Sequence, residues 1–524
     1  MSPFRRASAS HLPLRRPVVV VGAGHNGLVA ACYLARAGRE VIVVEGLDRP
    51  GGGSRTEERV PGFRFDLHSA AHNIINMTSI PAELDLAGAG LDYLEMDPFS
   101  VAIHADGRRV RFWRSIEATV DSIAESDPVE AAAYRAFMRR AVPLIKATMP
   151  AIRGEMSLAE APRRLANLAV ALRHHPLTVG RDLLGPYDAL LRRHLTSDLT
   201  RGPVAAFAAH AGVGPTGAGG ALFAFWQAAY HLFGQWHARG GAQGLTDALV
   251  RRLEALGGSL RCSARVSRIE TRGGRVVGVV LGEGERLLAG AVVTAIDPQV
   301  ALLELLDPPV GGRVGADLAA VGRSNVVQAL VHVATDALPA YPGARPGDWN
   351  GLQSYVDELG SMSAAWVGAE AGLMPDPLPV YAFTPSALDP GLAPPGCHTV
   401  YLACPAAPAR LRSDGGWEGA RPAFVEAILD VVESRAPGFR DSVVGLAPFT
   451  PDLMESEGGW RGANPMHIDI SAYQLGFFRP IPALADHRTP VAGLYVSGAG
   501  TAPTGGIAGT PGKMAARALL TDGC

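Results

Sequence analysis

Three glycines near the start of the chain have the spacing of a dinucleotide-binding site. Gly22, Gly24 and Gly27 form the pattern Gly-x-Gly-x-x-Gly directly after a run of four valines. The first glycine allows a tight turn, the second lets the backbone approach a pyrophosphate, and the third lets a helix pack closely on a strand. The N-terminus of that helix offers free N–H groups and a partial positive charge to the phosphates. His25 and Asn26, which lie within this turn, therefore belong to the predicted site.

An acidic residue stands where such a site requires one. Glu45 ends a second apolar run, over 41–44. Its carboxylate can accept hydrogen bonds from both hydroxyls of an adenosine ribose, which disfavours a 2′-phosphate at that place. The same glycine pattern recurs over 212–217, but no strand precedes it and no acid follows at the right distance. We interpret that second match as a loop.

A parallel sheet with packed helices is needed to position these residues. The valine run over 18–21 is typical of a strand that is buried on both faces. Apolar residues recur at helical spacing over 28–37, and Gly38 ends that pattern. The order of strand, turn, helix, strand and acid predicts an α/β fold with a Rossmann-like dinucleotide-binding domain.

Length, charge and cysteine content exclude several other classes of protein. A chain of 524 residues is too long for one ordinary core, and its net charge of −2 gives no basic footprint for nucleic acid. The five cysteines form no Cys-x-x-Cys pair, so we expect neither a redox dithiol nor a metal site. This cysteine usage fits a reducing, cytoplasmic location. No uninterrupted apolar stretch reaches the roughly 18 residues of a membrane-spanning helix.

We expect the dinucleotide-binding domain to be assembled from separated stretches of chain. Its glycine-rich and strand-like segments fall in three ranges, 17–73, 237–298 and 453–524. Residues 74–236 have Ala-, Leu- and Arg-rich helical patterns and predict a mostly helical lobe. Mixed patterns over 299–452 predict an inserted substrate domain. Residues 1–16 are basic, with no apolar stretch before the fold begins, and predict a disordered tail.

Six segments together carry a specific resemblance. They are VGAGHNGL (21–28), E-x-x-x-x-PGG (45–52), RGGAQGL (239–245), NPMHIDIS (464–471), RPIP (479–482), and GLYVSGAGT with GGI-x-G (493–501 and 505–509). With these, the chain resembles the phytoene desaturase-like family of FAD-dependent oxidoreductases, part of the wider glutathione-reductase/amine-oxidase flavin superfamily. Its opening is most similar to the branch of pyridine-nucleotide-disulphide-oxidoreductase-domain proteins.

The resemblance implies an extended, non-covalently bound FAD. It places the pyrophosphate on 22–27, the ribose on Glu45 and the adenine at the backbone of Val266. The residues that it places near the phosphates, the ribityl chain and the flavin are Gly51, Gly52, Gly53, Ser54, Arg55, Gly498, Gly500 and Ile507. Many members have arginine directly after the glycine pair, where this chain has Gly53, so Arg55 is the expected substitute. The C-terminal glycine loop contains no cysteine that could form a covalent flavin bond.

The implied reaction is hydride transfer from a substrate C–H bond to flavin N5. His68, His72 and His467 lie in segments that should pass the flavin and are the candidates for a catalytic base, although each could instead be a packing histidine. Aromatic residues concentrated over 223–236 could line a channel for a lipophilic substrate or could simply form core.

Three functions remain open at this point. The first is a desaturase or dehydrogenase acting on an apolar or natural-product-like small molecule. The second is an amine oxidase-type flavoenzyme, and the third is a non-catalytic escort of prenylated proteins, for which intact glycine sites would be unnecessary. We expect a small, lipophilic substrate and no nucleic acid partner, and a peripheral membrane contact of the helical lobe stays open.

Overall fold

The run of four valines forms the central strand of a five-stranded parallel sheet. Every residue of β1 (Val18–Val21) is buried. The strand order is β20, β13, β1, β2, β9, with β20 at Leu494–Val496, β13 at Ala291–Thr294, β2 at Val41–Val44 and β9 at Ser259–Arg261. Val18 and Val20 join one hydrophobic core, and Val19 and Val21 join another, so the sheet is covered on both faces.

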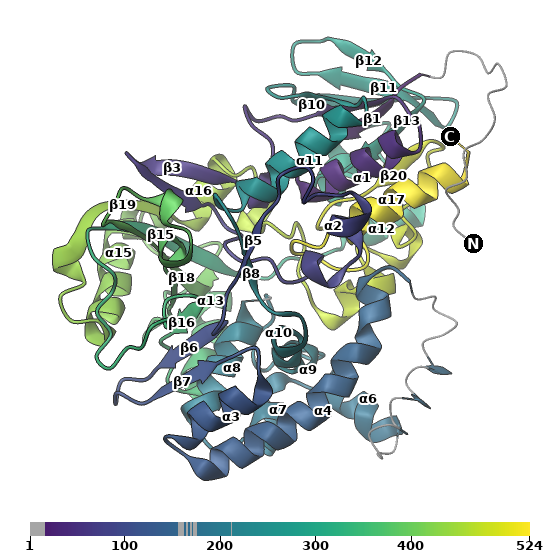
Figure 1. The fold of residues 1–524 in the computed structure, drawn as a ribbon. Coiled ribbons are helices and arrows are strands. Elements are labelled where there is room, and N and C mark those ends of the chain that lie inside the picture. The colour runs from purple at the N-terminus through teal and green to yellow at the C-terminus, as the bar shows by residue number, and fades with distance from the viewer. Residues whose placement is uncertain are drawn as a thin grey trace.

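Helices cover one face of this sheet and a smaller sheet covers the other. The helices are α1 (His25–Arg36), α11 (Gln243–Ala255) and α17 (Thr510–Thr521), and α1 packs against the other two. The smaller sheet has the order β12 (Arg286–Leu288), β11 (Arg275–Leu281), β10 (Val266–Arg272), β14 (Leu306–Asp307). Figure 1 shows the purple N-terminal and yellow C-terminal parts of the chain side by side in this domain. The predicted α/β class is confirmed.

The structure is a computed structural model that describes residues 16–155, 162–163, 166–167, 170, 176–210 and 212–523. The tail expected over 1–16 therefore lies outside the described residues, apart from Arg16.

A seven-stranded sheet forms a second layer beside the first domain. Its order is β19 (Val443–Phe449), β15 (Val326–Thr335), β18 (His398–Pro408), β17 (Tyr381–Phe383), β16 (Leu352–Ser354), β6 (Ser100–Ile103), β7 (Arg109–Phe112). Helix α15 (Gly416–Arg435) packs on one face of this sheet. Strands β6 and β7 come from the stretch that we expected to be mostly helical. They are too short to show a clear period, and β6 is fixed by parallel pairing with the distant β16.

Helices make up the third part, at the bottom of Figure 1. They are α3 (Ile116–Ala124), α4 (Pro128–Ile152), α6 (Pro176–Leu184), α7 (Tyr187–His194), α8 (Asp198–Ala209), α9 (Ala221–Phe225) and α10 (Gln227–Phe233). Their shared core includes the fully buried Tyr134, Phe137 and Phe225. Asp127 caps α4 by accepting hydrogen bonds from the backbone of Val129 and Glu130.

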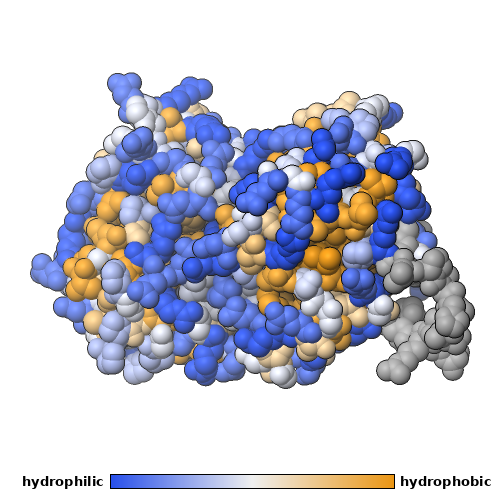
Figure 2. All heavy atoms as spheres, turned by 90° about the horizontal axis from the view of Figure 1, so that it is seen from above, coloured by the Kyte–Doolittle hydropathy of each residue, from blue (hydrophilic) through white to orange (hydrophobic). Residues whose placement is uncertain are grey.

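Short elements join the three parts. β3 (Thr56–Val60) and β4 (Phe63–Asp66) form a hairpin. β5 (Tyr93–Glu95) pairs antiparallel with β8 (Trp236–Ala238), which lies far along the chain. The other α-helices of the described residues are α2 (Ile80–Glu83), α12 (Gly312–Ala319), α13 (Leu359–Glu370), α14 (Pro385–Leu388) and α16 (Pro451–Ser456). Figure 2 shows one face, where polar side chains predominate and hydrophobic ones gather in two separate areas. Among the described helices, none is long and apolar enough to span a membrane.

Candidate active site

The first glycine loop has the geometry that its sequence predicts. Gly22 has a φ of +99°, which favours glycine. A Cβ atom on Gly27 would lie 2.1 Å from the carbonyl oxygen of Gly22, so only glycine lets α1 pack this closely on the turn. A Cβ on Gly24, by contrast, would have no atom within 4 Å. The loop therefore leaves open space directly at the N-terminus of α1.

Glu45 lies beside this loop at the end of β2. Its Oε2 accepts a hydrogen bond of 2.8 Å from the backbone N–H of Ala23, and its Oε1 accepts one of 3.0 Å from that of Leu47. A carboxylate has about four lone-pair positions, so about two remain for ribose hydroxyls. The Glu45 carbonyl accepts a hydrogen bond from Ala264, two residues before the predicted adenine contact, Val266.

A second glycine loop closes against the first. The backbone N–H of Gly51 donates a 3.0 Å hydrogen bond to the carbonyl of Ala23, and both Gly51 and Gly52 have positive φ. Arg55 is buried, donates from Nε to the carbonyl of Gly52, and lies 3.4 Å from a carboxylate oxygen of Glu57. Burial lowers the pKa of Arg55, although Glu57 opposes that shift. Arg55 therefore supports this loop from within the protein.

The C-terminal glycine loop completes the site. Gly498 has a φ of +95°, and a Cβ on Gly500 would lie 2.7 Å from a ring carbon of Pro298. Nε2 of His25, at the start of α1, donates a 3.1 Å hydrogen bond to the carbonyl of Gly506. The carbonyl of Ile507 accepts a hydrogen bond from the backbone of Ile75. All three glycine loops thus meet around the N-terminus of α1.

Unpaired polar atoms show that these loops fit a dinucleotide. Both side-chain polar atoms of Asn26 and the hydroxyl of Ser54 are buried without a hydrogen-bond partner among the described residues. Buried polar groups ordinarily have partners, so such atoms indicate a missing ligand. The open space at Gly24, the N-terminus of α1 and the free lone pairs of Glu45 match a pyrophosphate followed by a ribose.

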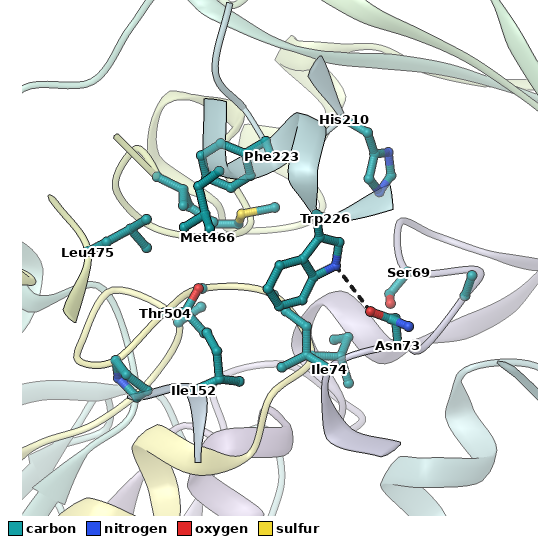
Figure 3. A pocket seen from close by; sticks show the side chains of 18 of the residues that line it. Ser69, Asn73, Ile74, Ile152, His210, Phe223, Trp226, Met466, Leu475 and Thr504 are labelled. Atoms are coloured by element: carbon teal, nitrogen blue, oxygen red, sulfur yellow. Dashed lines mark hydrogen bonds between the residues drawn. The ribbon is translucent and has the colours of Figure 1, made fainter. Parts of the chain in front are cut away.

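A large cavity begins where the glycine loops meet. Its volume is about 440 Å³, and His25, Gly53, Gly506 and Ile507 form one end of it. Figure 3 shows the apolar side chains that face into it, from the helical lobe and from the C-terminal segment. They include Ile74, Ile152, Phe207, Leu222, Phe223, Trp226, Tyr230, Met466, Ile470, Leu475, Phe477 and Phe478. Among the described residues that line it there is no Asp, Glu, Lys or Arg.

The structure brings one of the three predicted histidines to this cavity. His68 lines it, and burial lowers the pKa of its ring to about 3. His72 lies behind the wall, where its Nδ1 is 2.8 Å from the hydroxyl of Tyr93 and its Nε2 has no partner among the described residues. His467, with a φ of +68°, packs against Gly498 and Gly500 on the glycine loop. Burial lowers the pKa of His72 to about 3 and that of His467 to about 4.

The aromatic segment over 223–236 divides between cavity and core. Phe223, Trp226 and Tyr230 line the cavity, whereas Phe225 is fully buried in the helical core. Trp226 donates from its indole N–H to the side-chain oxygen of Asn73, as Figure 3 shows. His210 also lines the cavity. Sequence reasoning missed His210, because this residue follows the alanine-rich helix α8 and belongs to no motif.

Comparison with known proteins identifies the family. The model of the family "Flavin containing amine oxidoreductase" matches residues 27–347. The chain belongs to this family. The mouse protein "Pyridine nucleotide-disulfide oxidoreductase domain-containing protein 2" is 30% identical, over 96% of this chain and 93% of its own. A phytoene desaturase (lycopene-forming) from Paracoccus is 25% identical, over 98% of this chain and 99% of its own. These relatives confirm the predicted family resemblance.

Solved structures confirm the fold of this flavoprotein. Putrescine oxidase bound to putrescine has a TM-score of 0.61 at 19% identity, covering 97% of this chain and 99% of its own. The chain therefore has an amine oxidase-type flavoenzyme fold. It is an FAD-dependent oxidoreductase, and the glycine loops and Glu45 are the residues that fit the cofactor.

Proposed function

We propose that this flavoprotein is a desaturase or dehydrogenase that oxidises C–H bonds of an apolar small molecule. The observation that carries the proposal is the cavity beside Gly506 and Ile507, whose lining contains aromatic and aliphatic side chains and no charged Asp, Glu, Lys or Arg among the described residues. Each buried CH₂ group of a substrate contributes about 0.8 kcal/mol to binding. Such a cavity favours a hydrocarbon skeleton and penalises an ion.

The residues at the cavity would orient the substrate and exclude water. Flavin, when bound, supplies the hydride acceptor. Phe223 and Trp226 would pack on an apolar skeleton from the helical lobe, and Ile74 and Ile507 from the dinucleotide-binding domain. His68 lines the cavity with a neutral ring and is, of the three predicted histidines, the one that can receive a proton from the substrate. Its low pKa makes it a weak base, so we propose proton transfer at His68 as a secondary contribution.

Amine oxidation is the second candidate function. The putrescine oxidase fold supports it, because that enzyme's structure holds putrescine. An ammonium group, however, needs a carboxylate or an aromatic face in a dry site. The cavity offers aromatic faces such as Trp226 but no lining carboxylate among the described residues. The relatives named as phytoene desaturases favour an apolar substrate instead.

Anaerobic titration separates these candidates. Purified holoprotein is mixed with a panel of apolar isoprenoids and a panel of amines, and loss of the visible flavin absorption is followed. We expect bleaching by an apolar compound and none by amines. Ala206→Trp, which would fill the cavity from α8, should abolish that bleaching. Bleaching by amines alone would overturn the proposal.

We also propose a cytoplasmic protein whose helical lobe contacts a membrane, since apolar substrates partition into lipid. Leu177 and Leu184 on α6 are 78% and 69% exposed. Replacing both with serine should lower co-sedimentation with phospholipid vesicles. Leu288→Ser, on exposed β12 of the dinucleotide-binding domain, is the matched control. Full recovery of the unchanged protein in the supernatant would contradict the proposal.

A further inference from the structure

Two strands of the seven-stranded sheet present one row of side chains to the cavity. Leu352 and Ser354, on β16, both line it, whereas Gln353 between them does not. This alternation is that of a strand, whose successive side chains point to opposite faces. On the neighbouring β17, Tyr381 pairs with Ser354 and Phe383 pairs with Leu352, and both of these partners also line the cavity. Ser354 therefore lies on the face of the sheet that forms the cavity wall.

The hydroxyl group of Ser354 has no hydrogen-bond partner among the described residues. The residue is 1% exposed, and its Oγ is buried and unpaired. Among the described residues that line the cavity, no other has a buried side-chain polar atom without a partner. The hydroxyl of Thr148, for example, donates to the carbonyl of Ile145, and that of Tyr401 donates to the carbonyl of His68. One hydroxyl group of the wall thus has its bonding capacity unused.

Folding alone does not explain a serine at position 354. A buried polar group without a partner costs free energy, whereas an apolar group of the same shape is neutral or stabilising there. Buried polar groups ordinarily have partners, so an unpaired one on a cavity wall indicates a ligand. Rotation about its single side-chain bond moves a serine hydroxyl among three staggered positions, which lets the O–H group turn toward a ligand.

The surroundings of Ser354 decide which chemical group can meet it. The lining has no Asp, Glu, Lys or Arg among the described residues, and a serine hydroxyl carries no charge. Burying an ion in such a site costs far more than one hydrogen bond returns. The partner of this hydroxyl is therefore a neutral group. Oxygens of hydroxyl and carbonyl groups both accept a hydrogen bond from an O–H donor.

We propose that the substrate carries one neutral oxygen, of a hydroxyl or carbonyl group, on an otherwise apolar skeleton, and that Ser354 donates a hydrogen bond to this oxygen. Ser354 is then a specificity-determining residue of the cavity. The inference rests on the proposed function, because it narrows the substrate class of the same cavity from hydrocarbons to oxygenated ones.

Three ligands with one skeleton test this anchor. Octane has no oxygen, 1-octanol has a hydroxyl group, and 2-octanone has a carbonyl oxygen that only accepts. Binding to the flavin-loaded protein is measured by gas chromatography as the fall in ligand vapour above the solution. Each ligand is compared between the unchanged protein and Ser354→Ala, because this comparison cancels the cost of taking that ligand out of water. We expect Ser354→Ala to bind the alcohol and the ketone about 10-fold more weakly and octane with unchanged affinity.

A matched variant and a stability measurement complete the test. Thr148→Val also removes a hydroxyl from the wall, but one that is bonded to Ile145, so it should leave the relative affinities of the three ligands unchanged. Without ligand, Ser354→Ala should unfold at the same temperature as the unchanged protein or at a higher one, because it removes an unpaired buried hydroxyl.

The outcomes separate the anchor from the cavity. Unchanged binding of the alcohol and the ketone by Ser354→Ala would overturn the anchor and leave the apolar cavity intact. An equal loss for all three ligands would also overturn it, since Ser354 would then only pack. A lower unfolding temperature of ligand-free Ser354→Ala would show that the hydroxyl is bonded within the protein, which again overturns the anchor. Binding of none of the three ligands to the unchanged, flavin-loaded protein would contradict the apolar cavity, and with it the proposed function.

Discussion

Nε2 of His25 lies 3.1 Å from the carbonyl oxygen of Gly506, a residue 481 positions later in the chain. This contact joins the first glycine loop to the last at the end of the cavity. Burial lowers the pKa of His25 to about 4, so the donor is a neutral imidazole at physiological pH. The dinucleotide site is therefore closed by the two ends of the chain together.

Removing this contact should weaken cofactor binding. His25→Ala deletes one hydrogen bond between the loops, so we expect the Kd for FAD to rise about 5- to 10-fold. Fluorescence titration of the apoprotein with FAD measures it. His25→Asn, which keeps an N–H donor, should bind FAD more tightly than the alanine variant. An unchanged Kd in His25→Ala would show that the contact is irrelevant to the cofactor.

Two alanine substitutions in the first glycine loop should act on different properties. In Gly27→Ala the new Cβ would lie 2.1 Å from the carbonyl of Gly22, so we expect the free energy of unfolding to fall by about 1–3 kcal/mol. Gly24 has an ordinary φ of −68° and open space, so Gly24→Ala should leave apoprotein stability unchanged while weakening FAD binding. Thermal unfolding of the apoproteins and FAD titration separate the two effects. Equal stabilities of the two variants would contradict this assignment.

Glu45 should matter for the adenosine half of the cofactor. Glu45→Gln removes a charged acceptor, so the affinity for FAD should fall about 10- to 100-fold. FMN lacks the adenosine ribose and serves as the control ligand, whose affinity should change little. A parallel loss for FAD and FMN would indicate instead that Glu45 mainly supports the turn through Ala23 and Leu47.

The sequence predicts those parts of the site whose residues lie close together in the chain. Gly22, Gly24, Gly27 and Glu45 could be predicted, because strand, turn, helix and acid occur within one short stretch. The place of His210 in the cavity wall could not be predicted, because its ring is held against Gln328 and Tyr381, which are 118 and 171 residues away. Among the three predicted histidines, burial and packing decide which one reaches the cavity, and no local pattern encodes that.

The fold, too, is predictable where its residues lie close together in the chain. The five-stranded parallel sheet could be predicted, since its central valine run is apolar on both faces. Strands β6 and β7 could not be assigned to the second sheet. Each has four residues. β7 pairs with β6, and β6 joins the sheet by pairing with β16 through contacts some 250 positions apart, such as Ser100 with Leu352. Long-range pairing of this kind leaves little trace in a local window.

A buried ion pair should be important for stability. Arg111, on β7, donates two hydrogen bonds to Asp348, at 2.6 and 2.8 Å, and both side chains are almost fully buried. Asp348→Ala would leave the guanidinium without this partner, so we expect a loss of about 3–5 kcal/mol in the free energy of unfolding. Glu117→Ala, which breaks an exposed pair with Arg135, is the control and should cause no measurable change. Chemical denaturation measures the stability of both variants. Similar losses in the two variants would contradict the expected difference between the buried and the exposed ion pair.

A second buried cluster predicts a pH dependence of stability. Burial by itself would lower the pKa of His237, but Asp389 at 3.6 Å and Asp66 at 4.0 Å raise it above the ordinary value of 6.5. The charged ring therefore stabilises the fold fully below pH 6.5, and that stabilisation is lost as the pH rises through the raised pKa. Denaturation midpoints between pH 6 and 9 should fall in the unchanged protein. In His237→Gln the loss of stability that comes from deprotonation of His237 should be absent. Identical pH profiles of stability in the variant and the unchanged protein would contradict this role of His237.

A single anaerobic turnover would reveal whether the protein oxidises C–H bonds of an apolar substrate. Holoprotein in excess is mixed with the apolar compound that bleaches its flavin, and the product is identified by mass spectrometry and NMR. We expect a product that lacks two hydrogen atoms of the substrate and has a new double bond. Reduction of the flavin by amines alone, with release of ammonia and an aldehyde, would contradict it.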